Sequence, residues 1–398
     1  ASSALAENWP RFRGENGVGH SDLQGVPTNW TKDDYEWVLE LPGKGHSCPV
    51  VWGKQLFVTC GKEDGTRTTL CLDAITGKTI WQDSIQLEAS HLHKKNSYAS
   101  GTPCVDGERV YVTFGDDQHY TILAYSLSGE RLWSKDLGAF TSQHGFGISP
   151  IVHNGKVILP DDQMGPSKVE ALDVKTGNSV WSHERKFRRT SYATPLIAQV
   201  DGKDQIVCLS GAVGLAGLDP ETGNEIWSSG EMPMRTVGSP VMVAGKLVAT
   251  CGSGGRGKYL VAVEPAATSE LGEHQERTQN LPYVPTPIAN GNYLYLWCDD
   301  GIVCCVDMTQ PDLTKNVWRE RVGGNYSGSP VLINGKIYCI SEEGEIAVID
   351  ASPTFKDYGK SPLGDQSYAT PAVANGRVYF RGFNTLACLK AHGSALSE

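Results

Sequence analysis

Polar aromatic and basic side chains recur at one position of the sequence, three to six residues before a Pro that follows Ser, Thr or Cys. The eight residues are His46, Tyr98, His144, Tyr192, Arg235, Tyr283, Tyr326 and Tyr368. Tyr and His offer flat faces with hydrogen-bonding tips, and Arg can hold a carboxylate through two parallel hydrogen bonds. If they meet in space, they suit a planar or polar ligand. The alternative is that the Tyr side chains pack between repeats and the Arg side chains pair with acids near solvent.

Two further basic residues, Arg188 and Arg189, stand shortly before Tyr192 and are expected to join the same site. Acidic pairs form a second recurring set: Glu63-Asp64, Asp116-Asp117, Asp161-Asp162, Asp299-Asp300 and Glu342-Glu343. Oxygen-rich loops can hold calcium, but acids are also frequent in ordinary hairpin loops, and we favour that interpretation. His91 and His93 have no third ligand nearby in the sequence, so no metal site is predicted. No residue is assigned a catalytic role.

These residues recur because the sequence itself repeats. A dipeptide ending in Pro opens each repeat, at Cys48-Pro49, Thr102-Pro103, Ser149-Pro150, Thr194-Pro195, Ser239-Pro240, Thr286-Pro287, Ser329-Pro330 and Thr370-Pro371. Successive prolines are 41 to 54 residues apart, and the first interval is the longest. An Asp-Gly or Asn-Gly dipeptide follows in most repeats, which is typical of a two-residue hairpin turn. A period in the forties with alternating strand patterns predicts an all-β fold, an eight-bladed β-propeller.

The outer part of each repeat has its own signature. Residues 72–81 read Leu-Asp-Ala-Ile-Thr-Gly-Lys-Thr-Ile-Trp, and related segments occupy residues 172–181 and 218–227. The pattern predicts a strand ending in Asp, a tight turn whose Gly takes a positive φ, and a strand with Trp four residues after that Gly. Repeats five and seven have no Trp in this slot. We expect the Trp side chains to pack between blades.

Each repeat supplies four strands, except the last. Few residues follow 383–389, whereas residues 35–41, with Trp37, resemble a fourth strand with no repeat before it. We therefore expect this N-terminal strand to complete the last blade and close the ring, which removes an exposed sheet edge. The first strand of a propeller blade is innermost, so the residues before each Ser/Thr-Pro should converge at one mouth of the central channel.

Three segments are predicted. Residues 1–34 form an extended arm outside the repeat, which we expect to pack on the outer surface; residues 35–390 form the propeller; and residues 391–398 form a tail. Ala4-Leu5-Ala6 has the small-x-small form of a signal-peptidase site, which predicts a periplasmic or secreted protein. The alternative is a boundary within a cytoplasmic protein, and a lipid anchor before Ala1 is left open.

Composition argues against some partners. The 35 basic and 45 acidic residues give a net charge of −10, which repels a nucleic-acid backbone. No apolar run approaches the ~20 residues that a membrane-spanning helix needs. The eleven Cys are interpreted as small buried residues, since no CxxC spacing suggests zinc. Cys60 with Cys71, or Cys298 with Cys304, could form disulfides in an oxidising compartment. We expect a monomer.

The pattern of Asp, two variable residues, Thr-Gly and Trp resembles the tryptophan-docking repeat of quinoprotein-type β-propellers over roughly residues 35–390. One branch of that superfamily comprises dehydrogenases that depend on pyrroloquinoline quinone (PQQ), and the other is similar to BamB, a propeller scaffold of the outer-membrane assembly machinery. Residues 8–14, 96–103 and 142–147 also resemble uncharacterised PQQ-like repeat proteins of planctomycetes.

Resemblance to the dehydrogenases would imply PQQ, calcium, an adjacent Cys pair near the cofactor, an Asp base, and Glu and Asn metal ligands. Cys304 and Cys305 are adjacent, but they fall in an expected strand at slots where other repeats have Val or Ala. The chain is short for that branch and has no CxxCH cytochrome motif. The sequence therefore predicts a non-catalytic exported propeller that binds a protein or a small molecule at one mouth. The alternative is a PQQ- and calcium-dependent alcohol or sugar dehydrogenase, and a sensor or carbohydrate-binding module stays open.

Overall fold

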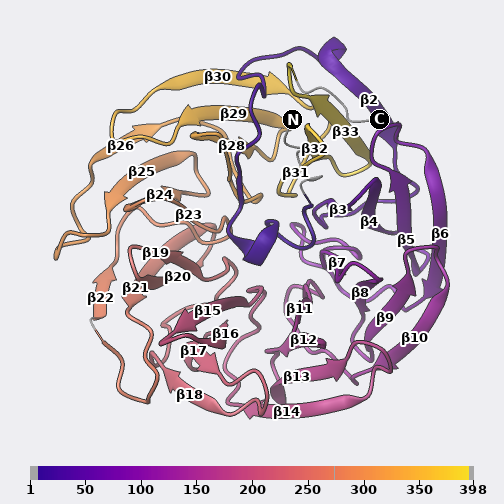
Figure 1. The fold of residues 1–398 in the computed structure, drawn as a ribbon, viewed down its shortest axis with the longest axis horizontal. Helices are drawn as coiled ribbons and strands as arrows, with labels where there is room; N and C mark the ends of the chain where they lie inside the picture. Colours follow the sequence, from indigo (N-terminus) through magenta and orange to yellow (C-terminus); the bar gives the residue numbers. More distant parts are fainter. Residues whose placement is uncertain (1–7, 273, 394–398) are drawn as a thin grey trace.

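The computed structural model describes residues 8–272 and 274–393. Their strands form eight separate sheets arranged around a central axis, as the sequence predicts for an eight-bladed β-propeller (Figure 1). Ala4-Leu5-Ala6 and residues 394–398 of the predicted tail lie outside the described residues. Within the described part of the chain, no helix has the length and apolar character needed to cross a membrane.

In blades one to four the chain runs from the innermost to the outermost strand. Blade one contains β3 (Val50–Trp52), β4 (Gln55–Gly61), β5 (Thr66–Asp73) and β6 (Thr79–Gln86). Blade two contains β7 (Cys104–Val105), β8 (Arg109–Gly115), β9 (Tyr120–Ser126) and β10 (Arg131–Asp136). Blade three contains β11 (Ile151–His153), β12 (Lys156–Asp161), β13 (Ser167–Asp173) and β14 (Ser179–Arg185). Blade four contains β15 (Leu196–Val200), β16 (Lys203–Ser210), β17 (Gly214–Leu218) and β18 (Glu225–Ser228).

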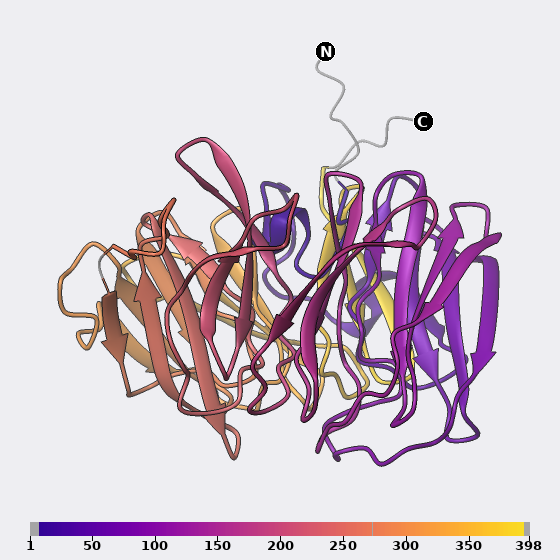
Figure 2. The ribbon, with the colours of Figure 1, turned by 90° about the horizontal axis from the view of Figure 1, so that it is seen from below.

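Blades five to seven continue in the same order, and Figure 2 shows their connections at the two ends of the ring. Blade five contains β19 (Val241–Val243), β20 (Lys246–Ser253), β21 (Arg256–Val263) and β22 (His274–Arg277). Blade six contains β23 (Ile288–Asn290), β24 (Tyr293–Trp297), β25 (Ile302–Asp307) and β26 (Trp318–Arg321). Blade seven contains β27 (Val331–Ile333), β28 (Lys336–Ile340), β29 (Glu345–Asp350) and β30 (Asp357–Pro362).

Blade eight is shared by the two ends of the chain. It contains β31 (Ala372–Ala374), β32 (Arg377–Arg381) and β33 (Thr385–Lys390), with β2 (Tyr35–Glu40) as its outermost strand. Trp37 of β2 lies opposite Cys388 of β33. The buried Arg377 side chain also joins the two segments, because its Nε and Nη2 atoms donate hydrogen bonds of 2.5 and 2.8 Å to the Glu36 carboxylate. The predicted closure of the ring is confirmed.

Trp side chains dock five of the eight blades onto the next blade. Trp133 of blade two donates its indole N–H to the carbonyl of Val174 in blade three, at 3.1 Å. Gly177 lies under the indole with φ of 70°, and a Cβ there would come within 2.7 Å of the ring. The Thr-Gly motif therefore needs Gly for two reasons, the left-handed backbone and the close approach of the indole. The same hydrogen bond joins Trp37 to Ile75, Trp81 to Leu127, Trp181 to Pro220 and Trp318 to Ser352.

Small residues lie directly across the sheet from the Trp side chains. Trp81 pairs with Cys71, Trp133 with Ala124 and Trp318 with Cys305. A large side chain at these positions would compete with the indole for the same space. The prediction that these cysteines replace Ala as small buried residues is confirmed, and all eleven cysteines are buried and free. Cys60 lies opposite Thr68 and Cys71 opposite Phe57, so these two do not form a cross-strand pair.

Hydroxyl groups of the Ser/Thr-Pro dipeptides link neighbouring blades around the channel. The backbone N–H of Ser239 donates to Thr286 Oγ1 in the next blade at 3.0 Å, and Thr286 N–H donates to Ser329 Oγ at 3.0 Å. Equivalent bonds join Cys48 to Thr102, Thr102 to Ser149, Thr194 to Ser239 and Ser329 to Thr370. Thr370 N–H donates to the thiol of Cys48 at 3.2 Å, so sulfur replaces the one missing hydroxyl. The dipeptide recurs because these hydroxyls satisfy buried backbone donors.

The N-terminal arm crosses the central channel, and the expectation that it packs on the outer surface is wrong. Trp9 exchanges backbone hydrogen bonds with Val51 of blade one, and Asn16 with Ile197 of blade four through its side chain. The arm contains η1 (Glu15–Gly17), β1 (His20–Ser21), which pairs in parallel with β27, and η2 (Lys32–Asp34). In Figure 1 the indigo helical turn lies at the centre of the ring. Innermost strands leave polar backbone groups facing the channel, and the arm supplies partners for them.

Candidate functional site

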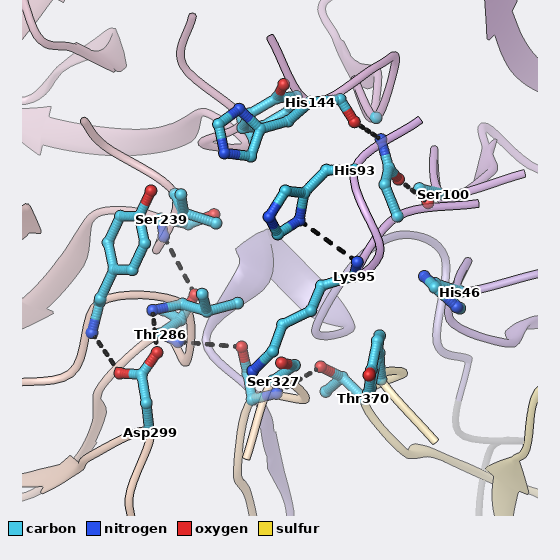
Figure 3. A pocket seen from close by; sticks show the side chains of 18 of the residues that line it. His46, His93, Lys95, Ser100, His144, Ser239, Thr286, Asp299, Ser327 and Thr370 are labelled. Carbon is cyan, nitrogen blue, oxygen red and sulfur yellow. Dashed lines mark hydrogen bonds between the residues drawn. The ribbon is translucent and has the colours of Figure 1, made fainter. Parts of the chain in front are cut away.

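A cavity of about 560 Å³ opens at one mouth of the channel. Its lining includes six of the ten predicted site residues: His46, His144, Tyr192, Arg235, Tyr283 and Tyr368. The Ser/Thr hydroxyl ring and Phe12 of the N-terminal arm also line it. In Figure 3, His46, His144 and Thr286 converge from different blades, with the ribbon of the arm behind them. The repeat therefore brings most of the predicted residues together, because each stands at the same point of its own blade.

The other four predicted residues lie outside the cavity lining. The Tyr98 ring carries the guanidinium of Arg67 on its face, 4.1 Å from the ring centre, and its hydroxyl donates to a backbone carbonyl. Tyr326 is fully buried against Trp297. Both therefore pack as the alternative interpretation expected. Arg188 and Arg189 are exposed, and Arg188 pairs with Glu231 at 2.8 Å.

Arg235 is the central charged group of the cavity. Its side chain is 8% exposed, and its Nη2 donates to Gln143 Oε1 at 2.9 Å. Its Nη1 lies 3.0 Å from His144 Nε2 and 3.5 Å from the Tyr283 hydroxyl. Burial, together with the charges of Arg235 and His93, lowers the pKa of His144 to about 4. His144 is therefore neutral at pH 7, and its Nε2 accepts a hydrogen bond from the guanidinium.

A strap whose residues were not predicted to belong to the ligand site extends along the cavity. It belongs to the connection between β6 and β7, and His93, Lys94, Lys95 and Asn96 line the cavity. The His93 ring lies 4.6 Å from that of His144, and Asn96 Nδ2 donates to the His144 carbonyl at 2.6 Å. The sequence did contain a signal for this strap, since the first interval between prolines is the longest, at 54 residues. Extra length between two repeats belongs to a connection that folds over one end of the ring.

The opposite wall of the cavity is aromatic. His46 is almost fully buried, and its ring centre lies 4.8 Å from that of Tyr368 and 4.9 Å from that of Phe383. Burial, with Lys44 and Arg381 nearby, lowers the pKa of His46 well below its ordinary value. The imidazole is therefore neutral and presents a flat, weakly polar surface. Such a wall suits the ring or apolar body of a ligand.

Acidic loop residues mainly hold the connections around the mouth. Asp116 accepts the backbone N–H of Glu88 at 2.9 Å, and Asp299 accepts that of Tyr283 at 2.7 Å. Asp299 is the acidic residue in the cavity lining, and burial raises its pKa to about 6. Among the described residues, no group of three or more His, Cys, Asp or Glu side chains is arranged to hold a metal. Asp299 is the one carboxylate among the described lining residues, and its oxygens accept backbone N–H groups, so the lining does not offer the set of carboxylates that usually holds calcium.

The adjacent Cys304 and Cys305 lie away from the cavity lining. They belong to β25, where Cys304 pairs with Leu296 and Cys305 with Tyr295, and both are fully buried. Neighbouring residues of a strand point to opposite faces of its sheet, so each thiol packs against a different neighbouring blade. The prediction that these residues are strand core is confirmed.

Comparisons with known proteins agree on the fold. A family model described as "Outer membrane protein assembly factor BamB" matches residues 27–203, 71–310 and 187–354. No curated protein matches the chain in sequence. Similar solved structures include a quinohemoprotein alcohol dehydrogenase from Comamonas testosteroni, with 13% identity, a TM-score of 0.71, and coverage of 98% of this chain and 82% of that one. BamB from Moraxella catarrhalis has 15% identity, a TM-score of 0.64, and coverage of 91% and 98%.

Proposed function

Because this chain belongs to the family described as outer membrane protein assembly factor BamB, we propose that it is a non-catalytic propeller that acts by binding a ligand at the mouth lined by Arg235. The cavity carries this proposal. Its volume of about 560 Å³ lies within the ~300–1,000 Å³ usual for small-molecule sites, and its lining combines aromatic faces with a few placed polar groups. A small molecule fits better than a folded polypeptide, since the strap at residues 93–96 already occupies part of the mouth.

The second candidate is the dehydrogenase, and two observations weigh against it. The carboxylates that would hold calcium are engaged with backbone N–H groups or with Lys95, and the adjacent cysteines lie in the core of blade six. The basic, partly aromatic lining is compatible with PQQ as a ligand, since that molecule is flat and carries three carboxylates. We therefore keep PQQ among the compounds to test and assign no redox step to the chain.

The proposal also covers the cellular location, the partners and the oligomeric state of the protein. The family description refers to the outer membrane, which supports an extracytoplasmic location. An assembly factor acts on other proteins, so a protein partner on the outer faces of the ring is compatible with a small ligand in the cavity. We propose that the chain acts as a monomer without nucleic acid, since its net charge is −10.

Ligand-observed NMR with a panel of PQQ, sugars and aromatic acids tests this function. Val237 lines the cavity and is partly exposed there, so Val237→Trp should fill the space without removing a buried contact. We expect at least one compound to bind the wild type and none to bind the Trp variant, with unchanged circular dichroism. Equal binding to both proteins would place the ligand elsewhere. Turnover of alcohols or sugars by protein reconstituted with PQQ and calcium, read with an artificial electron acceptor, would contradict the non-catalytic proposal.

A further inference from the structure

We propose that the ligand of this cavity is an organic anion whose carboxylate pairs with Arg235 and whose ring lies against the aromatic wall formed by His46 and Tyr368. This inference rests on the proposed function and names its class of ligand. It depends on the partners that Arg235 has, on the sign of the charge around the channel, and on the two chemically different walls of one cavity.

Arg235 is a buried cation without an anion. Its three hydrogen-bond neighbours, Gln143, His144 and Tyr283, are neutral groups. No carboxylate of the described residues lies within ion-pair distance of it, and its buried Nε has no hydrogen-bond partner there. A buried charge is costly unless an opposite charge compensates it. A carboxylate from the ligand would supply that charge at the one buried guanidinium that lines the cavity.

Other basic groups near the axis also lack acidic partners. Arg381 lies next to the cavity beside His46 and donates to the carbonyls of Ser47 and Thr59. Arg13 of the arm is fully buried, and none of its three guanidinium nitrogens has a hydrogen-bond partner among the described residues. The region around the axis is therefore basic, in a chain whose net charge is −10. The described cavity lining contains three basic residues, Lys94, Lys95 and Arg235, and one acidic residue, Asp299, and this excess of positive charge favours a negatively charged ligand at this mouth.

The acids near the cavity do not cancel this charge. Asp299 accepts two backbone N–H groups, from Tyr283 and Val284, and points its oxygens at them. Glu342 is engaged with Lys95 at 2.6 Å and with the Ser327 hydroxyl at 2.6 Å. Each carboxylate thus has its own partners. Arg235 is left for a group that the chain does not provide.

The size and the walls of the cavity indicate an organic anion rather than a simple inorganic one. A volume of about 560 Å³ is far larger than a carboxylate or a phosphate needs. Arg235 and the aromatic wall line the same space, so one molecule can present its charge to the first and its ring to the second. Histidine and tyrosine faces favour flat partners, whereas an inorganic ion would leave them uncovered.

A pair of nearly isosteric probes tests the inference. Benzoate and benzamide share a ring and differ in charge, and inorganic phosphate carries charge without a ring. Dissociation constants are measured by NMR titration for the wild type, Arg235→Gln, and Arg188→Gln, whose arginine is exposed outside the cavity. We expect benzoate to bind the wild type at least ~10-fold more tightly than benzamide or phosphate. Arg235→Gln should remove that preference, and Arg188→Gln should keep it.

Each other outcome has a definite meaning. Equal binding of benzoate and benzamide, abolished by Val237→Trp but insensitive to Arg235→Gln, would overturn the anion inference and leave the proposed function intact. If phosphate binds as tightly as benzoate, the ring contributes nothing to binding, and the claim that the ligand is an organic anion is wrong. Absence of binding by all three probes would overturn the inference, and the wider panel would then decide the proposed function. If Arg235→Gln fails to fold, salt dependence in the wild type replaces it: benzoate binding should weaken with added salt and benzamide binding should not.

Discussion

The Lys95 ammonium lies 2.6 Å from Glu342 Oε1, and this ion pair joins residues 247 positions apart. Lys95 belongs to the strap between blades one and two, and Glu342 to the loop between β28 and β29 of blade seven. Both side chains are partly shielded, with exposures of 36% and 15%. The pair therefore ties the strap across the cavity to a distant blade.

Lys95→Met should release the strap. A partly exposed ion pair contributes ~1 kcal/mol, so amide hydrogen exchange in residues 88–97 should become about fivefold faster. The matched control is Lys360→Met, which removes a 3.0 Å pair with Glu345 in blade seven, away from the strap. Unchanged exchange in residues 88–97 after Lys95→Met, or equal acceleration by the control, would show that the pair does not hold the strap.

Gly177→Ala should cost more stability than Gly155→Ala. The two glycines have nearly the same φ, 70° and 71°, so Ala pays the left-handed backbone penalty of ~1 kcal/mol at both. Only at Gly177 would the new Cβ meet the Trp133 ring, at 2.7 Å, whereas nothing lies within 4 Å at Gly155. The clash should add ~1–3 kcal/mol to the loss in free energy of unfolding. Urea unfolding measures both variants, and equal losses would mean that the indole moves aside at no cost.

Thr286→Val should destabilise the ring. It removes the acceptor of the buried Ser239 N–H, which now bonds Thr286 Oγ1 at 3.0 Å. An unsatisfied buried donor costs ~1–3 kcal/mol. Thr286→Ser keeps the oxygen and should recover most of that loss in a thermal unfolding experiment. If Ser and Val behave alike, the hydroxyl ring is not what joins these two blades.

Asp161→Asn should change the pH dependence of stability. Burial, with a further contribution from the charge of Asp162, raises the pKa of Asp161 from 3.8 to about 7. The folded state thus binds the proton of Asp161 more tightly than the unfolded chain does. The resulting contribution to the free energy of unfolding is complete below the pKa of Asp161 in the unfolded chain, and it is lost as the pH rises toward 7. Between pH ~3.5 and ~8 the wild type should lose up to ~4 kcal/mol relative to the Asn variant. Asp117→Asn, at an exposed neighbouring loop, is the control and should follow the wild type.

The sequence by itself determined the architecture. The spacing of Ser/Thr-Pro dipeptides, the Thr-Gly turns with their Trp, and the orphan strand at residues 35–41 predicted eight blades and a ring closed by the N-terminal strand. These features are local and repeated. Each repeat packs against equivalent neighbouring repeats, so the period of the sequence is enough to predict the architecture. The same logic predicted that residues such as His144, Arg235 and Tyr368 would meet at one mouth.

Only the tertiary structure decided what fills and covers that mouth. Tyr98 and Tyr326 stand at the predicted position in the repeat, but the Tyr98 ring packs against Arg67 and the Tyr326 ring against Trp297. No pattern in the sequence predicts these two contacts. The arm crosses the channel and the strap reaches Glu342 through contacts between residues far apart in the chain. Neither segment repeats, so the period does not predict where it lies, and its contacts with distant blades fix its position. The repeat period thus predicted the ring of blades, whereas the arm and the strap, which do not repeat, supply the rest of the cavity lining.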